Sequence, residues 1–246
     1  MERIIIMGAT SGIGLAVARK LAAAGCRLGL AARHTESLAG IAAEYSGNIV
    51  CEDIDITRAD AGSRLRSLID RLGGMDCYLH VAGVGYGNPL LDPGKEIATV
   101  ETDVVGFTRM VGSAYRYFRD ECGGKGHIGA VTSVAGTNGI DRLAAYSASK
   151  CFDQCYLRAL SQLVRGEKLK IRITDIRPGW VRTPLLSRSG GYTMLMKPDY
   201  VAGRIIRAVR HGRRVAVIDW RWNIVVGLWR LLPNWLWVRI PVSVEI

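Results

Sequence analysis

The stretch that decides the fold is Arg3-Ile4-Ile5-Ile6-Met7-Gly8-Ala9-Thr10-Ser11-Gly12-Ile13-Gly14. A β-branched run is followed there by a Gly-x3-Gly-x-Gly turn and then by Leu15–Ala24, which is rich in strong helix formers. This order predicts a strand, a tight turn and a helix. Glycines let the backbone approach a pyrophosphate, whose charge would meet free N–H groups at the helix N-terminus. We therefore expect a dinucleotide site, with a plain tight turn as the alternative.

Further apolar runs recur along the chain, and segments with helical periodicity separate most of them. These runs are Arg27–Ala31, Ile49–Glu52, Cys77–Val81, His127–Thr132, Ile171–Ile176 and Val215–Ile218. The alternation predicts βαβ units, and hence an α/β fold with a single doubly wound, Rossmann-type parallel sheet. We assign residues 1–219 to this dinucleotide-binding domain and residues 220–246 to a C-terminal helical appendage.

Composition narrows the class of protein. The chain has 246 residues, 49% of them hydrophobic, and a net charge of +11, which favours anionic partners such as phosphorylated cofactors or acidic membranes. No nucleic-acid-binding module accompanies this charge, so we expect no nucleic acid partner. The six cysteines are scattered without Cys-x-x-Cys, and the histidines lack metal-ligand spacing. We expect reduced thiols, no metal, no cleaved signal peptide and a cytoplasmic protein.

The end of the second predicted strand bears on cofactor choice. An acidic residue there would bind the ribose hydroxyls of NAD, whereas an arginine suits the 2′-phosphate of NADP. The sequence has Ala32-Arg33 at this point. It therefore indicates NADP(H), with a solvated arginine at a strand end as the alternative.

Ser133, Tyr146 and Lys150 form the candidate catalytic group. Tyr146 and Lys150 are four residues apart, so on a helix they share one face. A nearby ammonium favours the phenolate and brings the tyrosine closer to working pH as a proton donor or acceptor. Ser133 would donate a hydrogen bond to a substrate oxygen that becomes charged. Taken alone, Tyr-x-x-x-Lys is also common on surface helices.

In this order and spacing, the motifs resemble those of the short-chain dehydrogenase/reductase family over residues 1 to about 210. The matching segments are Gly8–Gly14, Asp55-Ile56, Ala82-Gly83, Ser133 with Tyr146 and Lys150, and Pro178-Gly179-Trp180-Val181-Arg182-Thr183. The resemblance implies that Tyr146 gives or takes the carbonyl proton, that Lys150 also binds the nicotinamide ribose, and that NAD(P)H delivers hydride.

With Arg33 added from the strand-end argument, the expected cofactor-binding residues are Gly8, Thr10, Ser11, Gly12, Ile13, Gly14, Arg33, Asp55, Ile56, Ala82, Gly83, Tyr146, Lys150, Pro178, Gly179, Val181 and Thr183. We also expect a homodimer or homotetramer.

Two positions depart from the family pattern. His80-Val81 stands where the family usually has Asn-Asn, which removes a strand-bridging amide and is expected to loosen the sheet centre. Asp103 stands where the family usually has an asparagine that orients a water in the proton relay. Asp103 is therefore a candidate catalytic residue that would hold this water and pair with Lys150, or else a residue with only a local structural role.

The C-terminal segment is unusual, because five of the six tryptophans lie in residues 220–246. It resembles the tails of lipid- and steroid-type members of the family. Tryptophan and arginine beside leucine predict an interfacial helix over residues 220–240, interrupted at Pro233, that contacts acidic membranes. The alternative is packing on its own domain or on a second subunit.

Upstream of this tail, residues 185–200 are expected to form a lid for a hydrophobic substrate, with Leu185, Leu186, Met194, Leu195 and Met196 as its apolar side chains and Gly190-Gly191 as its hinge.

Three functions follow as hypotheses. The first is an NADPH-dependent oxidoreductase that interconverts a ketone or aldehyde and an alcohol on an apolar substrate. The second is a 3-oxoacyl-carrier-protein-type reductase, for which the net charge would dock an acidic carrier. The third is a non-enzymatic NAD(P)(H)-binding sensor, suggested by Asp103 and His80 and opposed by the intact Ser133, Tyr146 and Lys150.

Overall fold

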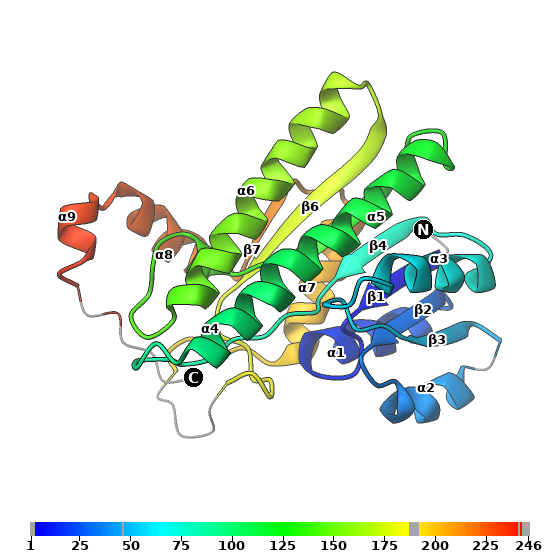
Figure 1. Ribbon diagram of the computed structural model, residues 1–246, viewed down its shortest axis with the longest axis horizontal. Helices are drawn as coiled ribbons and strands as arrows, with labels where there is room; N and C mark the ends of the chain where they lie inside the picture. The colour runs from blue at the N-terminus through cyan, green and yellow to red at the C-terminus, as the bar shows by residue number, and fades with distance from the viewer. Residues whose placement is uncertain (1–2, 46, 187–191, 241, 243–246) are drawn as a thin grey trace.

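A computed structural model describes residues 3–45, 47–186, 192–240 and 242. Its centre is a seven-stranded parallel sheet with strand order β3-β2-β1-β4-β5-β6-β7 (Figure 1). The strands are β1 (Arg3–Met7), β2 (Arg27–Ala32), β3 (Ile49–Asp53), β4 (Cys77–His80), β5 (Lys125–Val131), β6 (Lys170–Pro178) and β7 (Val215–Ile218). Every apolar run predicted as a strand is one, so the doubly wound sheet is confirmed.

Helices cover both faces of this sheet (Figure 1). They are α1 (Gly12–Ala23), α2 (Ala39–Glu44), α3 (Ala61–Leu72), α4 (Pro93–Val100), α5 (Phe107–Asp120), α6 (Ala144–Gly166), α7 (Pro198–Arg210), α8 (Trp220–Leu231) and α9 (Asn234–Trp237). Helices α1, α2, α7 and α8 pack on one face, and α3, α5 and α6 pack on the other. A π turn over Glu101–Gly106 joins α4 to α5.

The sheet is buried on both faces, which explains its continuous apolar strands. In β1, Ile5, Ile6 and Met7 are completely buried, with Ile5 and Ile6 in opposite core layers. The strand order reverses between β1 and β4, whose carboxyl ends therefore separate and open a crevice. The fold thus places a ligand site at the glycine turn that follows β1.

The C-terminal segment adds to this core through one face of α8. Trp222 and Val226 point inward and are each 3% exposed, in the same core layer as β1. Pro233 separates α8 from α9, as predicted. In the described part of the chain, no helix is both long enough and apolar enough to cross a bilayer. All six cysteines are free thiols.

Candidate active site

A cleft of about 530 Å³ lies at the carboxyl ends of the strands. Of the predicted catalytic and cofactor-binding residues, all except Asp103 line it. They are Gly8, Thr10, Ser11, Gly12, Ile13, Gly14, Arg33, Asp55, Ile56, Ala82, Gly83, Ser133, Tyr146, Lys150, Pro178, Gly179, Val181 and Thr183. Residues far apart in the sequence therefore meet in one site.

The glycine turn forms a cradle too tight for side chains. A Cβ added to Gly14 would lie 1.9 Å from the carbonyl oxygen of Gly8. Gly8 itself has a φ of +91°, and a Cβ there would lie 2.5 Å from the backbone nitrogen of Ala82. At the start of α1, the Ser11 side chain makes no capping hydrogen bond. The first N–H groups of α1 are thus available to an anion, so the cradle fits the pyrophosphate of a dinucleotide.

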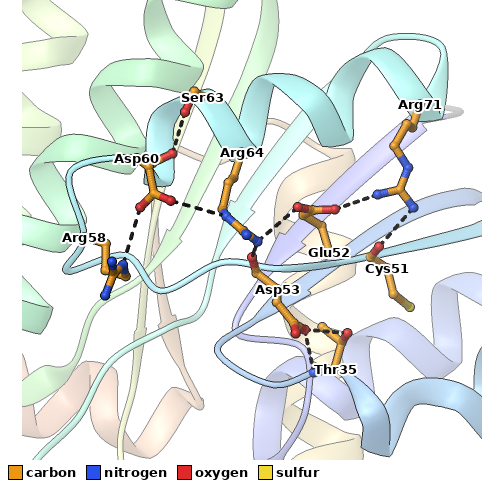
Figure 2. A network of polar contacts seen from close by, with 9 residues as sticks. All are labelled: Thr35, Cys51, Glu52, Asp53, Arg58, Asp60, Ser63, Arg64 and Arg71. Carbon is orange, nitrogen blue, oxygen red and sulfur yellow. Dashed lines mark hydrogen bonds and ion pairs between the residues drawn. The ribbon is translucent and has the colours of Figure 1, made fainter.

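A polar network fixes the other end of the cleft, where β2 and β3 end (Figure 2). The Asp53 carboxylate accepts hydrogen bonds from the backbone N–H and the hydroxyl of Thr35, at 2.9 and 2.7 Å. Glu52 binds Arg64 and Arg71 from α3, at 3.2 and 2.6 Å. Asp53 and Glu52 are thus engaged by Thr35 and by the arginines of α3. Arg33 is exposed and lines the same end of the cleft.

Ser133, Tyr146 and Lys150 lie at the inner end of the cleft. Ser133 follows β5, and its hydroxyl oxygen accepts a hydrogen bond from the Ala135 N–H at 3.1 Å. Tyr146 is in the first turn of α6, and the Lys150 ammonium lies 5.6 Å from the centre of its ring. Burial raises the pKa of the Tyr146 phenol, while Lys150 and a hydrogen bond with Ser133 oppose this effect. The charges of Asp103 and Asp153 act with burial, and the pKa of Tyr146 lies above its usual value, so Lys150 favours the phenolate without offsetting the other effects.

Two buried carboxylates hold Lys150. Its Nζ lies 2.8 Å from Oδ2 of Asp103 and 3.2 Å from Oδ2 of Asp153. Burial alone would lower the pKa of Lys150, but the two carboxylates outweigh burial and raise it. Asp103 lies behind Gly83, where it accepts a hydrogen bond from the Val84 N–H at 2.8 Å. Asp153 was missed at the sequence level, although its position three residues after Lys150 on the same helix was a signal.

His80 fills the space below the site. It is 1% exposed, its Nδ1 lies 2.9 Å from the Tyr78 hydroxyl, and its ring meets the Phe107 ring edge-on. The strand ladder continues through His80 to both β1 and β5, so the expected loosening of the sheet centre is not seen. Burial lowers the pKa of His80 to about 3. A neutral imidazole therefore replaces the expected amide.

The predicted lid is only partly supported. Leu185 and Leu186 line the cleft. Met196, in contrast, is buried in the core, and its backbone hydrogen-bonds to Trp180 and Arg182. The prediction that Met196 belongs to a lid is wrong, because this backbone pairing fixes it beside the site. The hinge Gly190-Gly191 lies outside the described residues.

Aromatic rings connect the cleft to the C-terminal helices. Tyr192, Trp180, Trp222, Trp229 and Trp237 form an aromatic row, with successive ring centres 5.6, 6.3, 6.3 and 5.3 Å apart. Trp222 lies against Gly179, where an added Cβ would come within 2.0 Å of the indole. The inner face of α8 therefore packs on its own domain, one of the two alternatives for the tail.

The far end of the aromatic row meets the loop before the catalytic helix. The Trp237 indole N–H donates to the carbonyl of Gly139 at 2.6 Å, and the Asn138 amide donates to the carbonyl of Trp229 at 3.1 Å. This loop leads into α6 and Tyr146. The C-terminal helices thus support a wall of the site, which the sequence did not indicate.

No group of three or more His, Cys, Asp or Glu side chains is placed to hold a metal ion within the described ranges. The site combines a nucleotide-sized cleft, the half-buried Tyr146, the buried Lys150 and the hydroxyl of Ser133. Such a set of groups is suited to proton transfer at an oxygen atom.

Comparisons with known proteins show which sequences and folds this chain resembles. The family model for short chain dehydrogenases matches residues 2–190. An uncharacterized oxidoreductase of Mycobacterium tuberculosis is 33% identical over an alignment of 246 positions that covers 94% of each chain.

Solved structures share the fold. A short chain dehydrogenase from Burkholderia cenocepacia, in complex with NADP, matches with a TM-score of 0.82 at 18% identity, over 98% of this chain and 97% of that one. An actinorhodin polyketide ketoreductase variant with NADPH matches with a TM-score of 0.77 at 23% identity, over 88% and 95% of the two chains.

Proposed function

The chain belongs to the short-chain dehydrogenase family, a family of oxidoreductases, and on that premise we propose that it interconverts a ketone or aldehyde and an alcohol on an apolar substrate, with NADP(H) as cofactor. One observation carries the proposal. Ser133, Tyr146 and Lys150 converge at one end of a cleft whose other end carries Arg33.

NADP(H) suits both ends of this cleft. The N–H groups at the start of α1 would hold the pyrophosphate, and the exposed Arg33 would bind the 2′-phosphate through its planar guanidinium. Asp55 and Ile56 would flank the adenine, and Pro178-Gly179 would contact the nicotinamide. The similar structures that contain NADP and NADPH support this choice.

The chain's own residues would supply the proton and stabilise the charges that form. A bound NADPH supplies the hydride in the reductive direction. The Tyr146 hydroxyl donates its proton to the carbonyl oxygen, and Ser133 donates a hydrogen bond to the same oxygen as negative charge develops. Lys150 stabilises the resulting phenolate. Asp103 fixes the ammonium of Lys150 from the side away from the cleft.

An apolar substrate is supported by the side chains near Tyr146. Ala135, Ile140 and Leu143 form a small buried cluster, against which Tyr146 and Trp180 pack. Leu185 and Leu186 line the neighbouring part of the cleft. A hydrocarbon group bound here would exchange water for apolar contacts, whereas a charged group would lose hydration without a partner.

The test of catalysis is NADPH oxidation with a panel of carbonyl compounds matched in length and differing in charge. We expect turnover of apolar members. Tyr146→Phe should remove this turnover while NADPH still binds, because only the hydroxyl is lost. Near-normal turnover in Tyr146→Phe would exclude the phenol from the mechanism. NADPH binding without turnover of any carbonyl compound by the unmodified protein would favour the sensor function.

The test of cofactor choice compares Arg33→Ala with Arg27→Ala, a control at the opposite end of β2. A charged hydrogen-bonded contact contributes about 1.5–3 kcal/mol, so Arg33→Ala should weaken NADPH binding by about tenfold or more and leave NADH binding unchanged. Arg27→Ala should change neither. Equal dissociation constants for NADPH and NADH in the unmodified protein would refute the assignment.

A carrier-protein-type reductase is the second candidate, supported by the net charge of +11. It predicts that a β-ketoacyl group attached to an acidic carrier protein is reduced at much lower concentration than the same group on a short thiol. Salt should remove this advantage, because docking would be electrostatic. Equal efficiency for the two substrates would contradict it.

We further propose that the outer face of the C-terminal helices binds acidic membranes. Trp220, Ile224, Leu228 and Leu231 recur along one side of α8 and are 55–80% exposed. Trp235 and Val238 are exposed apolar side chains further along the segment, and Arg230 and Arg239 are exposed cations in it, whereas Arg221 is paired with Asp219. Rings and leucines at headgroup depth, with cations near anionic lipid, suit an interfacial helix.

The membrane test uses the complete chain, since cutting at Asp219 would also remove Trp222 from the core. Leu228→Ser combined with Leu231→Ser should abolish co-sedimentation with phosphatidylglycerol vesicles and leave thermal stability unchanged. Phosphatidylcholine vesicles should bind the unmodified chain weakly. If the paired substitution changes the oligomeric state and the unmodified chain ignores both kinds of vesicle, this face binds a second subunit instead.

We also propose that the protein forms a homodimer or a homotetramer. Ile97 on α4 and Leu163 on α6 are exposed apolar side chains on helices that a second copy could cover. Light scattering during gel filtration should give a mass of two or four chains, and a monomeric mass at micromolar concentration would contradict it.

A further inference from the structure

Lys150 lies between two carboxylates that are removed from water. The side chains of Asp103 and Asp153 are 0% and 1% exposed, and that of Lys150 is 6% exposed. One buried cation therefore faces two potential anions, a few ångströms below the phenol that the proposed reaction needs. With both carboxylates ionised, the three groups would carry a net charge of −1 at a place where a phenolate must form.

The hydrogen bonds show which carboxyl group is better suited to hold a proton. Asp103 accepts from the Val84 N–H at 2.8 Å and from the Ser149 hydroxyl at 3.5 Å, in addition to its ion pair with Lys150. Oδ2 of Asp153 accepts a hydrogen bond from the Lys150 ammonium, whereas Oδ1 is buried without a hydrogen-bond partner in the described structure. A buried carboxylate with an empty oxygen is costly, so protonation of Asp153 relieves the crowding of charge.

The groups around Asp153 act in the same direction. Burial raises the pKa of Asp153 to about 7; Lys150 opposes this rise, and Asp103 and Asp175 add to it. Asp175, on β6, is paired with Arg177 at 2.5 Å. Tyr146 on α6 and His80 on β4 are the other titratable groups near Lys150, and His80 stays neutral because burial and Lys150 lower its pKa.

We propose that Asp153 is a positioning residue that controls the acidity of Tyr146 through Lys150. While Asp153 carries a proton, Asp103 is the one remaining counter-ion of Lys150 among the described residues, and the ammonium stabilises the phenolate. When Asp153 loses its proton to solvent, a second negative charge offsets Lys150, and the proton is held more tightly on Tyr146. This inference rests on the proposed function for its catalytic consequence, but the coupling of the two ionisations does not require turnover.

The first experiment measures ionisation of Tyr146 without any substrate. The ultraviolet difference between the unmodified chain and Tyr146→Phe, titrated from pH 6 to 11, isolates this phenol. The same difference is then taken in the Asp153→Asn background. We expect the ionisation of Tyr146 to move about one pH unit lower in Asp153→Asn, the scale of a nearby buried charge. Asp70→Asn, which removes an exposed carboxylate on α3, should leave it in place.

The second experiment measures kcat against pH for carbonyl reduction. The unmodified enzyme should lose activity in two steps, one near neutral pH as Asp153 ionises, and Asp153→Asn should lack that first step. Superimposable titrations of Tyr146 in the two backgrounds would overturn the inference, whatever the activity. A shifted titration in a chain that reduces no carbonyl compound would support the coupling and reject the proposed function. Far-ultraviolet circular dichroism checks that Asp153→Asn is folded.

Discussion

Replacing Trp222 with alanine tests whether the C-terminal helices belong to the cofactor site. Trp222 is 3% exposed, and cutting back a buried aromatic side chain costs about 3–5 kcal/mol. Its indole N–H is buried without a partner in the described structure, so its removal returns about 1 kcal/mol. We therefore expect Trp222→Ala to lower the free energy of unfolding by about 3 kcal/mol, or Tm by about 6–12 °C for a chain of this length.

Trp220→Ala is the matched control. It removes the same side chain two residues earlier on α8, where the ring is 67% exposed, and should change stability by less than about 0.5 kcal/mol. Urea denaturation followed by far-ultraviolet circular dichroism measures both variants without depending on tryptophan emission. Trp222→Phe should recover most of the loss, because it restores an aromatic ring and omits the unpartnered N–H.

The same pair of variants should differ in cofactor binding. Trp222 lies against Gly179 in the segment proposed to contact the nicotinamide, so its removal leaves that backbone unsupported. NADPH should bind more weakly to Trp222→Ala and normally to Trp220→Ala. If the two variants have equal stability and equal affinity, the packing of α8 against the cleft does not contribute as argued.

Two other changes have defined outcomes. Gly14→Ala places a Cβ 1.9 Å from the Gly8 carbonyl oxygen, so this variant should bind NADPH at least tenfold more weakly in a fluorescence titration. The control Gly40→Ala, whose Cβ would meet nothing within 4 Å, should bind NADPH normally. Equal affinities of the two variants would contradict the pyrophosphate-binding role of the glycine turn. The second change is His80→Gln. Near pH 5, the slope of the unfolding free energy against pH should be smaller in this variant than in the unmodified chain by about 1.4 kcal/mol per pH unit. The reason is that burial lowers the pKa of His80 to about 3, so unfolding takes up a proton between that pH and about 6.5 and stability falls as the pH drops. Parallel pH profiles from urea denaturation would contradict this expectation.

Local sequence signals account for the predicted part of the molecule. The strands and the glycine turn depend on runs of a few residues, and the spacing of Tyr146 and Lys150 depends on one helical turn. For such features, neighbouring residues in the chain contain most of the information. The sheet and the set of residues lining the cleft could therefore be anticipated.

The missed features depend on contacts between distant segments. Trp222 packs on Gly179, 43 positions earlier, and nothing local distinguishes it from the exposed Trp220. The pairing of Asp103 with Lys150 was predicted, but the π turn that carries Asp103 shifts the helix register without a recognisable sequence signal. Met196 looked like a lid residue because an apolar side chain in a connecting segment suits either a lid or a core.

The packing of α8 also has a consequence for the order in which the protein is made. Trp222 and Val226 share a core layer with Ile4 and Ile6 of β1, which leave the ribosome long before α8. Domains generally begin to fold during synthesis from the N-terminal end. In this protein, the core layer between β1 and α8 is complete, and Gly179 is covered, only after α8 has been synthesised. A chain whose synthesis stops before α8 would thus expose the apolar surface that Trp222 and Val226 cover, beside the nucleotide cleft. Chaperones and proteases would be expected to bind such a surface.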